Sequence, residues 1–361
     1  MLLHMSVYFN CPTIPHSSEE LQKKKKKFEL QFFSLQPPDC PLSYCDMIFR
    51  KSIHKQTVRL LSHSSFLRSS YNQVSRKTVA DIHQFHQSQK PISVVTAHDF
   101  ITAKLVDAGD IDICLVGDSL ANTTLGYQDT NELTLDEMMY HVQSVLRGND
   151  RSLIIADLPF GSFEASVEQA TKSAISLVQK GKVQGVKLEG GNSENIPTIE
   201  KLISVGIPVM GHVGLTPQKH NAIGGFKLQG KDAKGALDIY QECLNLQKAG
   251  VFAIVLECIP NKIAQYITEN LSVPTIGIGA GPFCSGQVLV ISDMLELKNP
   301  EESHIAKFVK PYAQFYQVGV DAMKRYKLDV ETKQFPLADE HGYKIKKDVF
   351  EQFKQEAQNL K

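Results

Sequence analysis

The stretch LIIADLPFGSFEASVEQATKSAISLVQKGKVQGVKLEGG, residues 153–191, indicates how this chain folds. It opens with an apolar run at 153–156, continues with an amphipathic segment at 166–180 that stops at Gly181, and closes with a second apolar run at 185–188. Near-continuous apolar character, rather than alternation, is typical of parallel strands that are covered on both faces. The stretch therefore predicts a strand, a helix and a second, parallel strand.

The same alternation continues on both sides of this stretch. Helices are predicted at 133–146 and 233–249, with a capping box from Thr134 to Glu137 and a stop at Gly250. Eight strands in strict β/α order predict a closed (β/α)₈ TIM barrel, and a doubly wound open sheet is the alternative. The connection between the last two strands is too short for a full helix. The six further strands are predicted at 93–96, 113–117, 208–211, 253–256, 275–278 and 287–291.

We expect residues 80–361 to form a single barrel that carries the catalytic site, followed by C-terminal helices. One such helix is predicted at 301–326, packed against the outside of the barrel. Residues 1–79 lack the alternation and are expected to form an N-terminal extension without fixed structure.

Composition excludes several classes of protein. The chain has 361 residues, 42% of them hydrophobic, with 39 Lys and Arg against 39 Asp and Glu. This is enough apolar material for a core, and the balanced charge argues against nucleic-acid or membrane partners. No run of about 18 apolar residues is present, so no transmembrane helix is expected. The seven cysteines have no metal-site spacing and are expected as reduced thiols.

Formal charge is unevenly distributed along the chain. Residues 1–80 hold 12 Lys and Arg against five Asp and Glu, whereas the rest holds 27 against 34. From Met47 to Ala80 there is no acidic residue, and Arg, Lys, Ser and scattered apolar residues dominate. Such a composition is typical of a mitochondrial presequence. We therefore predict a mitochondrial targeting segment at 47–79, with Met47 as a candidate start of translation. A disordered basic tail on a cytoplasmic protein is the alternative.

Acidic residues follow four of the predicted strands. Asp118, Asp157, Glu189 and Glu257 each stand where a strand ends. In a barrel the chemistry lies at this C-terminal rim, so the four carboxylates are expected to meet there. Lys187 is two residues before Glu189 and points to the same side of its strand. Any single acid could instead cap the following helix.

Four carboxylates beside one lysine would leave the mouth of the barrel strongly negative. Buried carboxylates either take up protons or need a cation, and oxygen ligands without thiolates favour Mg²⁺. We predict Asp118 and Asp157 as direct ligands, with Glu189 acting through water and Glu257 free to act as a base.

Two further rim features allow two interpretations each. His212 could be a ligand or a hydrogen-bonded rim residue, and the turn GIGAG at 277–281 could be a phosphate cradle or a site of close backbone packing.

Nine short blocks in a fixed order resemble the ketopantoate hydroxymethyltransferase family. The resemblance covers about residues 80–345, and it departs from the family pattern only at His98 and at Cys284-Ser285. The blocks are TAHDFITAKL (96–105), LVGDSL (115–120), ADLPF (156–160), VKLEGG (186–191), GHVGLTPQ (211–218), GGFKLQG (224–230), VLECIP (255–260), GIGAG (277–281) and SGQVLV (285–290).

The resemblance implies a TIM barrel of the phosphoenolpyruvate/pyruvate type and a homo-oligomeric enzyme. It implies transfer of a hydroxymethyl group from methylenetetrahydrofolate to 3-methyl-2-oxobutanoate, which gives 2-dehydropantoate for pantothenate biosynthesis. Mg²⁺ would be held by Asp118, Asp157 and Glu189, and Glu257 would accept a proton. The expected keto-acid-binding residues are Asp118, Ser119, Asp157, Lys187 and His212.

Three rival functions have distinct tests. A class-I aldolase would form a Schiff base on Lys187, which borohydride traps. Another Mg²⁺-dependent keto-acid barrel, a carbon–carbon lyase, would turn over without folate. A barrel that serves only as a scaffold would show no Mg²⁺-dependent keto-acid binding.

Overall fold

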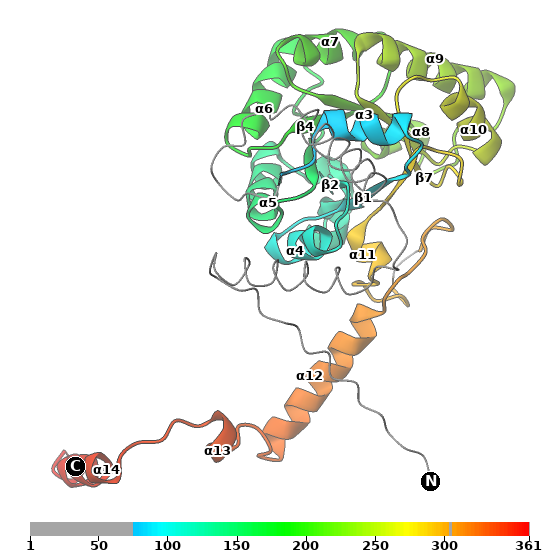
Figure 1. The fold of residues 1–361 in the computed structure, drawn as a ribbon. Coiled ribbons are helices and arrows are strands. Elements are labelled where there is room, and N and C mark those ends of the chain that lie inside the picture. Colours follow the sequence, from blue (N-terminus) through cyan, green and yellow to red (C-terminus); the bar gives the residue numbers. More distant parts are fainter. Residues whose placement is uncertain (1–74, 303–304, 361) are drawn as a thin grey trace, which may run out of the picture. The chain divides into compact units, whose positions relative to one another are not determined.

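The computed structural model describes residues 75–302 and 305–360, and eight parallel strands within them form a closed barrel (Figure 1). Each strand pairs with its sequence neighbours, and β1 closes the ring by pairing with β8. The barrel prediction is confirmed, and the open sheet is excluded. The strands are β1 Ile92–Thr96, β2 Ile113–Val116, β3 Leu153–Asp157, β4 Gly185–Glu189, β5 Val209–Gly214, β6 Ala253–Glu257, β7 Thr275–Ile278 and β8 Gly286–Leu289.

Helices surround the strands, as the strand–helix alternation predicts. The capping box between Thr134 and Glu137 is present, and Gly250 ends α9 in the left-handed conformation. Residues 279–285, between β7 and β8, are all described and contain no helix, as expected from their number. The helices before and around the barrel are α3 Val79–Gln87, α4 Phe100–Ala108, α5 Leu135–Gly148, α6 Val167–Gln179, α7 Ile196–Ser204, α8 His220–Ile223, α9 Ala233–Ala249, α10 Asn261–Glu269 and α11 Ile291–Met294.

The core has two layers because successive strand residues face opposite sides of the sheet. Leu153 and Ile155 of β3 belong to the cluster inside the barrel, whereas Ile154 and Ala156 pack between the strands and the helices. The same parity holds in β6, where Val255 faces inward. This two-residue period places the last residue of β3 and of β6 inside the mouth of the barrel.

The described chain starts with a segment that is fixed to the barrel before α3. Arg76 donates hydrogen bonds to the carbonyl oxygens of Asn149 and Ser152, and Ile82 of α3 is fully buried in the inner cluster. Residues 1–74 of the predicted extension, which include most of the targeting segment, lie outside the described residues. Among the helices of the described part, none combines the length and the apolar character needed to cross a bilayer.

The C-terminal helix differs from its prediction. It is α12, Phe315–Glu331, and it therefore starts 14 residues later than the predicted 301. Pro311 explains the shift, because proline inside a helix removes a backbone donor and clashes with the preceding turn. None of its side chains is buried, so the predicted packing against the barrel is wrong as well. The helices α13, Ala338–His341, and α14, Lys347–Gln358, also bury no side chain.

Candidate active site

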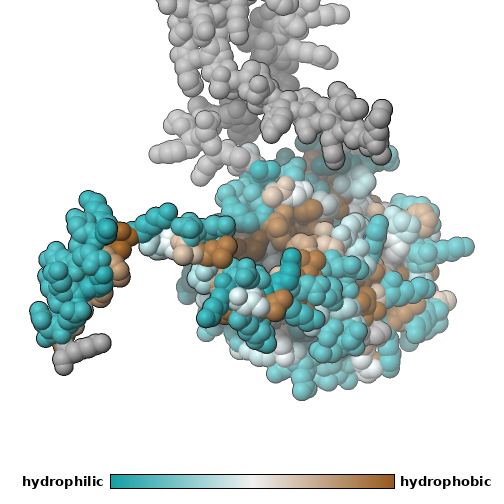
Figure 2. Space-filling view, turned by 90° about the horizontal axis from the view of Figure 1, so that it is seen from below, coloured by the Kyte–Doolittle hydropathy of each residue, from teal (hydrophilic) through white to brown (hydrophobic). Residues whose placement is uncertain are grey.

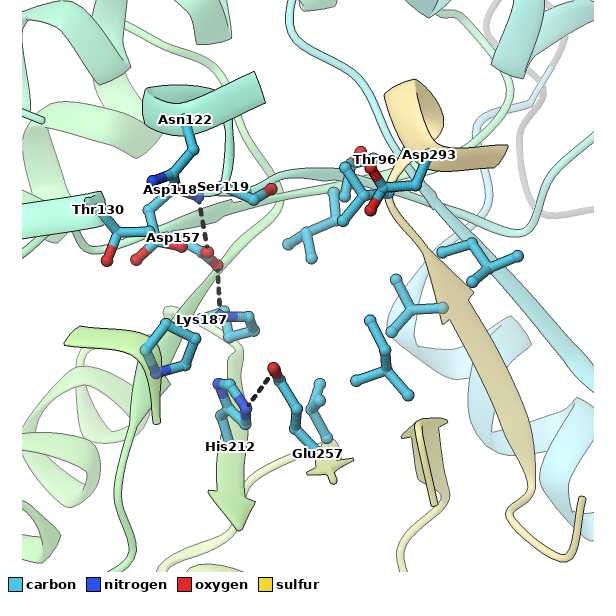
Figure 3. A pocket seen from close by; sticks show the side chains of 18 of the residues that line it. Thr96, Asp118, Ser119, Asn122, Thr130, Asp157, Lys187, His212, Glu257 and Asp293 are labelled. Carbon is cyan, nitrogen blue, oxygen red and sulfur yellow. Dashed lines mark hydrogen bonds and ion pairs between the residues drawn. The ribbon is translucent and has the colours of Figure 1, made fainter. Parts of the chain in front are cut away.

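The mouth of the barrel contains a cavity of about 190 Å³. Every site residue predicted from the sequence lines this cavity, and Figure 3 labels all of them except Glu189. Inward strand parity accounts for those in β3 to β6, whereas Asp118 and Ser119 follow the end of β2. The structure thus brings together residues from five strand ends. The predicted residues that line the cavity are Asp118, Ser119, Asp157, Lys187, Glu189, His212 and Glu257.

Asp157 connects three strands through its two carboxylate oxygens. Its Oδ1 lies 2.9 Å from Nζ of Lys187 on β4, and its Oδ2 accepts a hydrogen bond of 3.0 Å from the backbone N–H of Asp118, just after β2. All three side chains are buried. An ion pair that is buried in this way holds the two charges in one geometry.

Gln218 is a buried site residue to which the sequence analysis gave no role. Its Nε2 donates hydrogen bonds of 2.8 Å to Oδ2 of Asp118 and 3.0 Å to the carbonyl oxygen of Leu158. Its backbone N–H donates to Oε2 of Glu189 at 3.1 Å. Gln218 therefore orients two of the four acids. The signal that could have found it is its position at the end of the block GHVGLTPQ.

His212 and Glu257 form a second pair on neighbouring strands. His212 Nε2 lies 3.1 Å from Oε2 of Glu257, while its Nδ1 is 3.8 Å from Oε1 of Glu189. Glu257 is 16% exposed, against 2% for His212 and Glu189, so its carboxylate is the more accessible to a bound substrate. Gly214 allows the backbones of β5 and β6 to approach at this level, because its φ of +94° suits glycine and a Cβ there would overlap the carbonyl oxygen of Glu257.

Burial and mutual repulsion shift the proton affinities of these groups. Burial, and then the charge of Asp157, raise the pKa of Asp118 to about 7. Burial, and then Asp118, raise the pKa of Glu189 well above its usual value. Burial lowers the pKa of Lys187, but the carboxylates of Asp157 and Asp118 outweigh it and the net shift is upward. Burial, and then Lys187, lower the pKa of His212, which favours a neutral imidazole.

Residues 76–338 match the family model described as ketopantoate hydroxymethyltransferase. The chain belongs to this family. It is 45% identical over 303 residues to the 3-methyl-2-oxobutanoate hydroxymethyltransferase of Emericella nidulans, a match that covers 84% of this chain and 86% of the relative. It is 43% identical to the enzyme of that name from Saccharomyces cerevisiae, over 81% of this chain and 95% of the relative.

A plant relative and a solved structure complete the comparison. The 3-methyl-2-oxobutanoate hydroxymethyltransferase 1, mitochondrial, of Arabidopsis thaliana is 42% identical over 80% of this chain and 84% of its own length. Among solved structures, 2,3-dimethylmalate lyase, a member of the PEP mutase/isocitrate lyase superfamily, matches with a TM-score of 0.46 and 12% identity, over 78% of this chain and 98% of that chain.

Membership in the family makes the chain a hydroxymethyltransferase, and it removes the aldolase and scaffold alternatives. The structure agrees, because the Lys187 ammonium contacts Asp157 and its pKa is raised. A lysine must lose its proton before it can form a Schiff base, and these carboxylates oppose that loss.

The donor set of this hydroxymethyltransferase fits one Mg²⁺ ion at two carboxylates. Among the described residues, no group of three or more His, Cys, Asp and Glu side chains is arranged to hold a metal ion. However, Asp118 and Asp157 adjoin each other, and Oε1 of Glu189 is buried without a hydrogen-bond partner among the described residues. Mg²⁺ commonly takes one or two carboxylates and completes its shell with water and substrate oxygens.

The GIGAG turn is explained by close packing. Gly279 has a φ of +64°, and a Cβ there would lie 2.8 Å from the ring of Phe308. Gly281 has a φ of +81°, and a Cβ there would overlap the side chain of Asn261. Because both glycines are required by protein atoms alone, the structure favours the packing interpretation over the phosphate cradle.

We expect Asp118→Asn to stabilise the metal-free protein at alkaline pH. The pKa of Asp118 is about 7 in the fold, against 3.8 for the ordinary side chain. Between these values the folded state binds a proton that the unfolded state has released, so wild-type stability falls as pH rises from 4 to 7. In EDTA at pH 8 the variant should gain up to about 4 kcal/mol of unfolding free energy, and less than half of that at pH 5. Urea unfolding at both pH values measures the difference, and equal stabilities at pH 8 would contradict it.

Proposed function

We propose that this hydroxymethyltransferase transfers a one-carbon unit from methylenetetrahydrofolate to 3-methyl-2-oxobutanoate. The product is 2-dehydropantoate, on the route to pantothenate. The observation that carries the proposal is the position of Glu257, an accessible carboxylate in the same cavity as the buried Asp118–Asp157–Lys187 group. One side of the cavity can therefore hold a charged keto acid while a base faces it.

Proton removal at C3 of the keto acid is the first chemical task. Glu257 would take this proton, and His212, 3.1 Å away, would orient its carboxylate. The Lys187 ammonium would stabilise the negative charge that develops on the keto oxygen. Ser119 also lines the cavity and offers a hydroxyl group to the carboxylate of the substrate.

Asp118 and Asp157 would hold Mg²⁺, with Glu189 outside its first coordination shell. When bound, the ion would supply Lewis acidity that polarises the keto group and acidifies the adjacent C–H. Gln218 would keep Asp118 and Glu189 in place through its hydrogen bonds to both.

The bond changes balance with one water. A carbon–carbon bond forms between C3 and the methylene carbon of the donor, and the bonds from that carbon to the folate nitrogens break. Tetrahydrofolate leaves with the electron pairs of both bonds and with two protons, one from C3 of the keto acid and one from water. Water supplies the oxygen of the new hydroxyl group.

An omission assay tests this function against a lyase. Wild-type protein with Mg²⁺ and 3-methyl-2-oxobutanoate in D₂O should exchange the C3 proton without folate. The hydroxymethyl product should form only when methylenetetrahydrofolate is added, and EDTA should stop both processes. Cleavage of a keto acid in the absence of folate would refute the proposal.

We also propose that the chain is mitochondrial, with a cytoplasmic location as the alternative. The Arabidopsis thaliana relative is named as mitochondrial, and residues 47–79 of this chain have the composition of a targeting segment. A reporter that carries residues 47–80 should enter mitochondria, and a cytosolic signal would contradict the proposal.

We propose a homo-oligomeric assembly, in line with the family resemblance. Helices α12 and α14 expose apolar side chains such as Val318, Met323 and Phe353, and Figure 2 shows apolar patches among the hydrophilic residues of the described surface. Such side chains often become buried between subunits. Light scattering on the full chain should give a mass of at least twice 40.2 kDa, and the mass of a monomer would contradict the proposal.

A further inference from the structure

The active-site cavity has two walls of different chemistry. The charged groups of the site extend from the ends of β2 to β6, whereas Thr96 and Asp293 lie across the cavity from Asp157 and Lys187 (Figure 3). This second wall comes from the ends of β1 and β8 and from the residues that follow β8. Its apolar members include Val288, Leu289, Val290, Phe308 and Val309.

The second wall is more apolar than the keto acid requires. In the proposed function the carboxylate and keto oxygens of that substrate use the charged wall, and only its two methyl groups are apolar. Apolar lining with one polar group that fixes orientation is typical of a site for a flat organic ligand. The one-carbon donor must bring its reacting carbon into the same cavity, so the second wall is available for it.

Asp293 is the carboxylate of this second wall. It lies in α11, whose first residue is fixed because the backbone N–H of Ile291 donates a 2.9 Å hydrogen bond to Oγ1 of Thr96. One oxygen of Asp293 lies 3.0 Å from Nζ of Lys298. Its side chain is 28% exposed and that of Lys298 is 35% exposed, so solvent screens this ion pair and a ligand can compete with it.

We propose that Asp293 binds the pterin ring of the folate co-substrate, an inference that rests on the proposed function. A pterin presents a ring N–H and an exocyclic 2-amino group side by side on one edge. These two donors match the two oxygens of a carboxylate in a bidentate pair. The flat ring then lies against the apolar side chains of the second wall, with the ring of Phe308 available for stacking.

The test measures the affinity of wild type and Asp293→Asn for tetrahydrofolate by calorimetry, in the presence of Mg²⁺ and keto acid. Asn has nearly the same shape, but it lacks the charge and turns one acceptor into a donor. We expect the Kd to rise by about 10- to 100-fold, the loss typical of a hydrogen bond to a charged group. Exchange of the C3 proton without folate should persist, which shows that the variant is folded.

A control variant and a ligand analogue isolate the contact. Lys298→Gln removes the ion-pair partner but keeps the carboxylate, so its Kd should stay within threefold of wild type. A tetrahydrofolate analogue without the 2-amino group should bind wild type more weakly. Because Asp293→Asn has already lost this contact, it should show a much smaller further loss.

Four results would overturn the inference. The first is a wild-type Kd in Asp293→Asn, and the second is an equal loss from the analogue in both proteins. The third is loss of C3 exchange in Asp293→Asn, which would show that the substitution disturbs folding or the binding of the keto acid. The fourth is a wild type that exchanges the C3 proton but transfers nothing from methylenetetrahydrofolate. That result would remove the proposed function too, whereas the first two leave it standing.

Discussion

Glu257→Gln should lower the rate of C3 proton exchange by about 10²- to 10⁴-fold, the contribution typical of a positioned general base. The amide cannot accept the proton, yet it keeps the size of the side chain beside His212. The affinity for Mg²⁺ and keto acid should change by less than about threefold, because the Asp118–Asp157 pair is untouched. NMR of the keto acid in D₂O measures exchange, and calorimetry measures binding.

Glu200→Gln is the matched control for this variant. Glu200 lies on α7 with an exposed side chain, so the same chemical change occurs there outside the cavity. This control should exchange at the wild-type rate. If Glu257→Gln also exchanged the C3 proton at the wild-type rate, Glu257 would not be the base.

Asp157→Asn should reduce hydroxymethyl transfer by at least about 10³-fold, because Lewis-acid stabilisation amounts to several kcal/mol and 1.36 kcal/mol is a factor of ten. The single oxygen of the amide can still accept a hydrogen bond from the backbone N–H of Asp118. The other position becomes an NH₂ group that faces the Lys187 ammonium, where wild type has a carboxylate oxygen at 2.9 Å. Mg²⁺ should lose one of its two carboxylates, so metal binding by calorimetry should weaken along with activity.

Asp238→Asn provides the control for loss of one negative charge. Asp238 is exposed on α9 and should leave both metal affinity and transfer unchanged. If Asp157→Asn bound Mg²⁺ as tightly as wild type, the two-carboxylate site would be wrong. If only activity fell, Asp157 would act through Lys187 rather than through the metal.

The barrel and its rim were predictable because they follow from local periodicity. Apolar runs of four or five residues predict the strands, and the two-residue period then decides that Lys187 and Glu189 share a face. The location of the four acidic residues at the rim could be predicted from the position at which each strand ends. The predicted C-terminal helix starts too early because its range runs through Pro311, and proline breaks a helix whatever its flanking pattern.

The contacts between the rim residues could not be predicted from local pattern. Gln218 bonds to Asp118, 100 residues earlier in the chain, and no periodicity links the two. Likewise, Asp293 follows the last strand as an ordinary residue of a short helix, and only the closed ring turns it toward the cavity. Such contacts depend on the directions of side chains from segments that are far apart in the sequence and meet only in the folded barrel.

The sequence by itself determined the eight-stranded barrel, its family and the residue types at the ends of its strands, because short-range pattern and motif order carry that information. The tertiary structure alone decided which atoms of those residues meet and how strongly their protons are held. Burial and the distances between charges arise only when separate strands close into one mouth, and these two quantities set the pKa values of Asp118, Lys187 and His212.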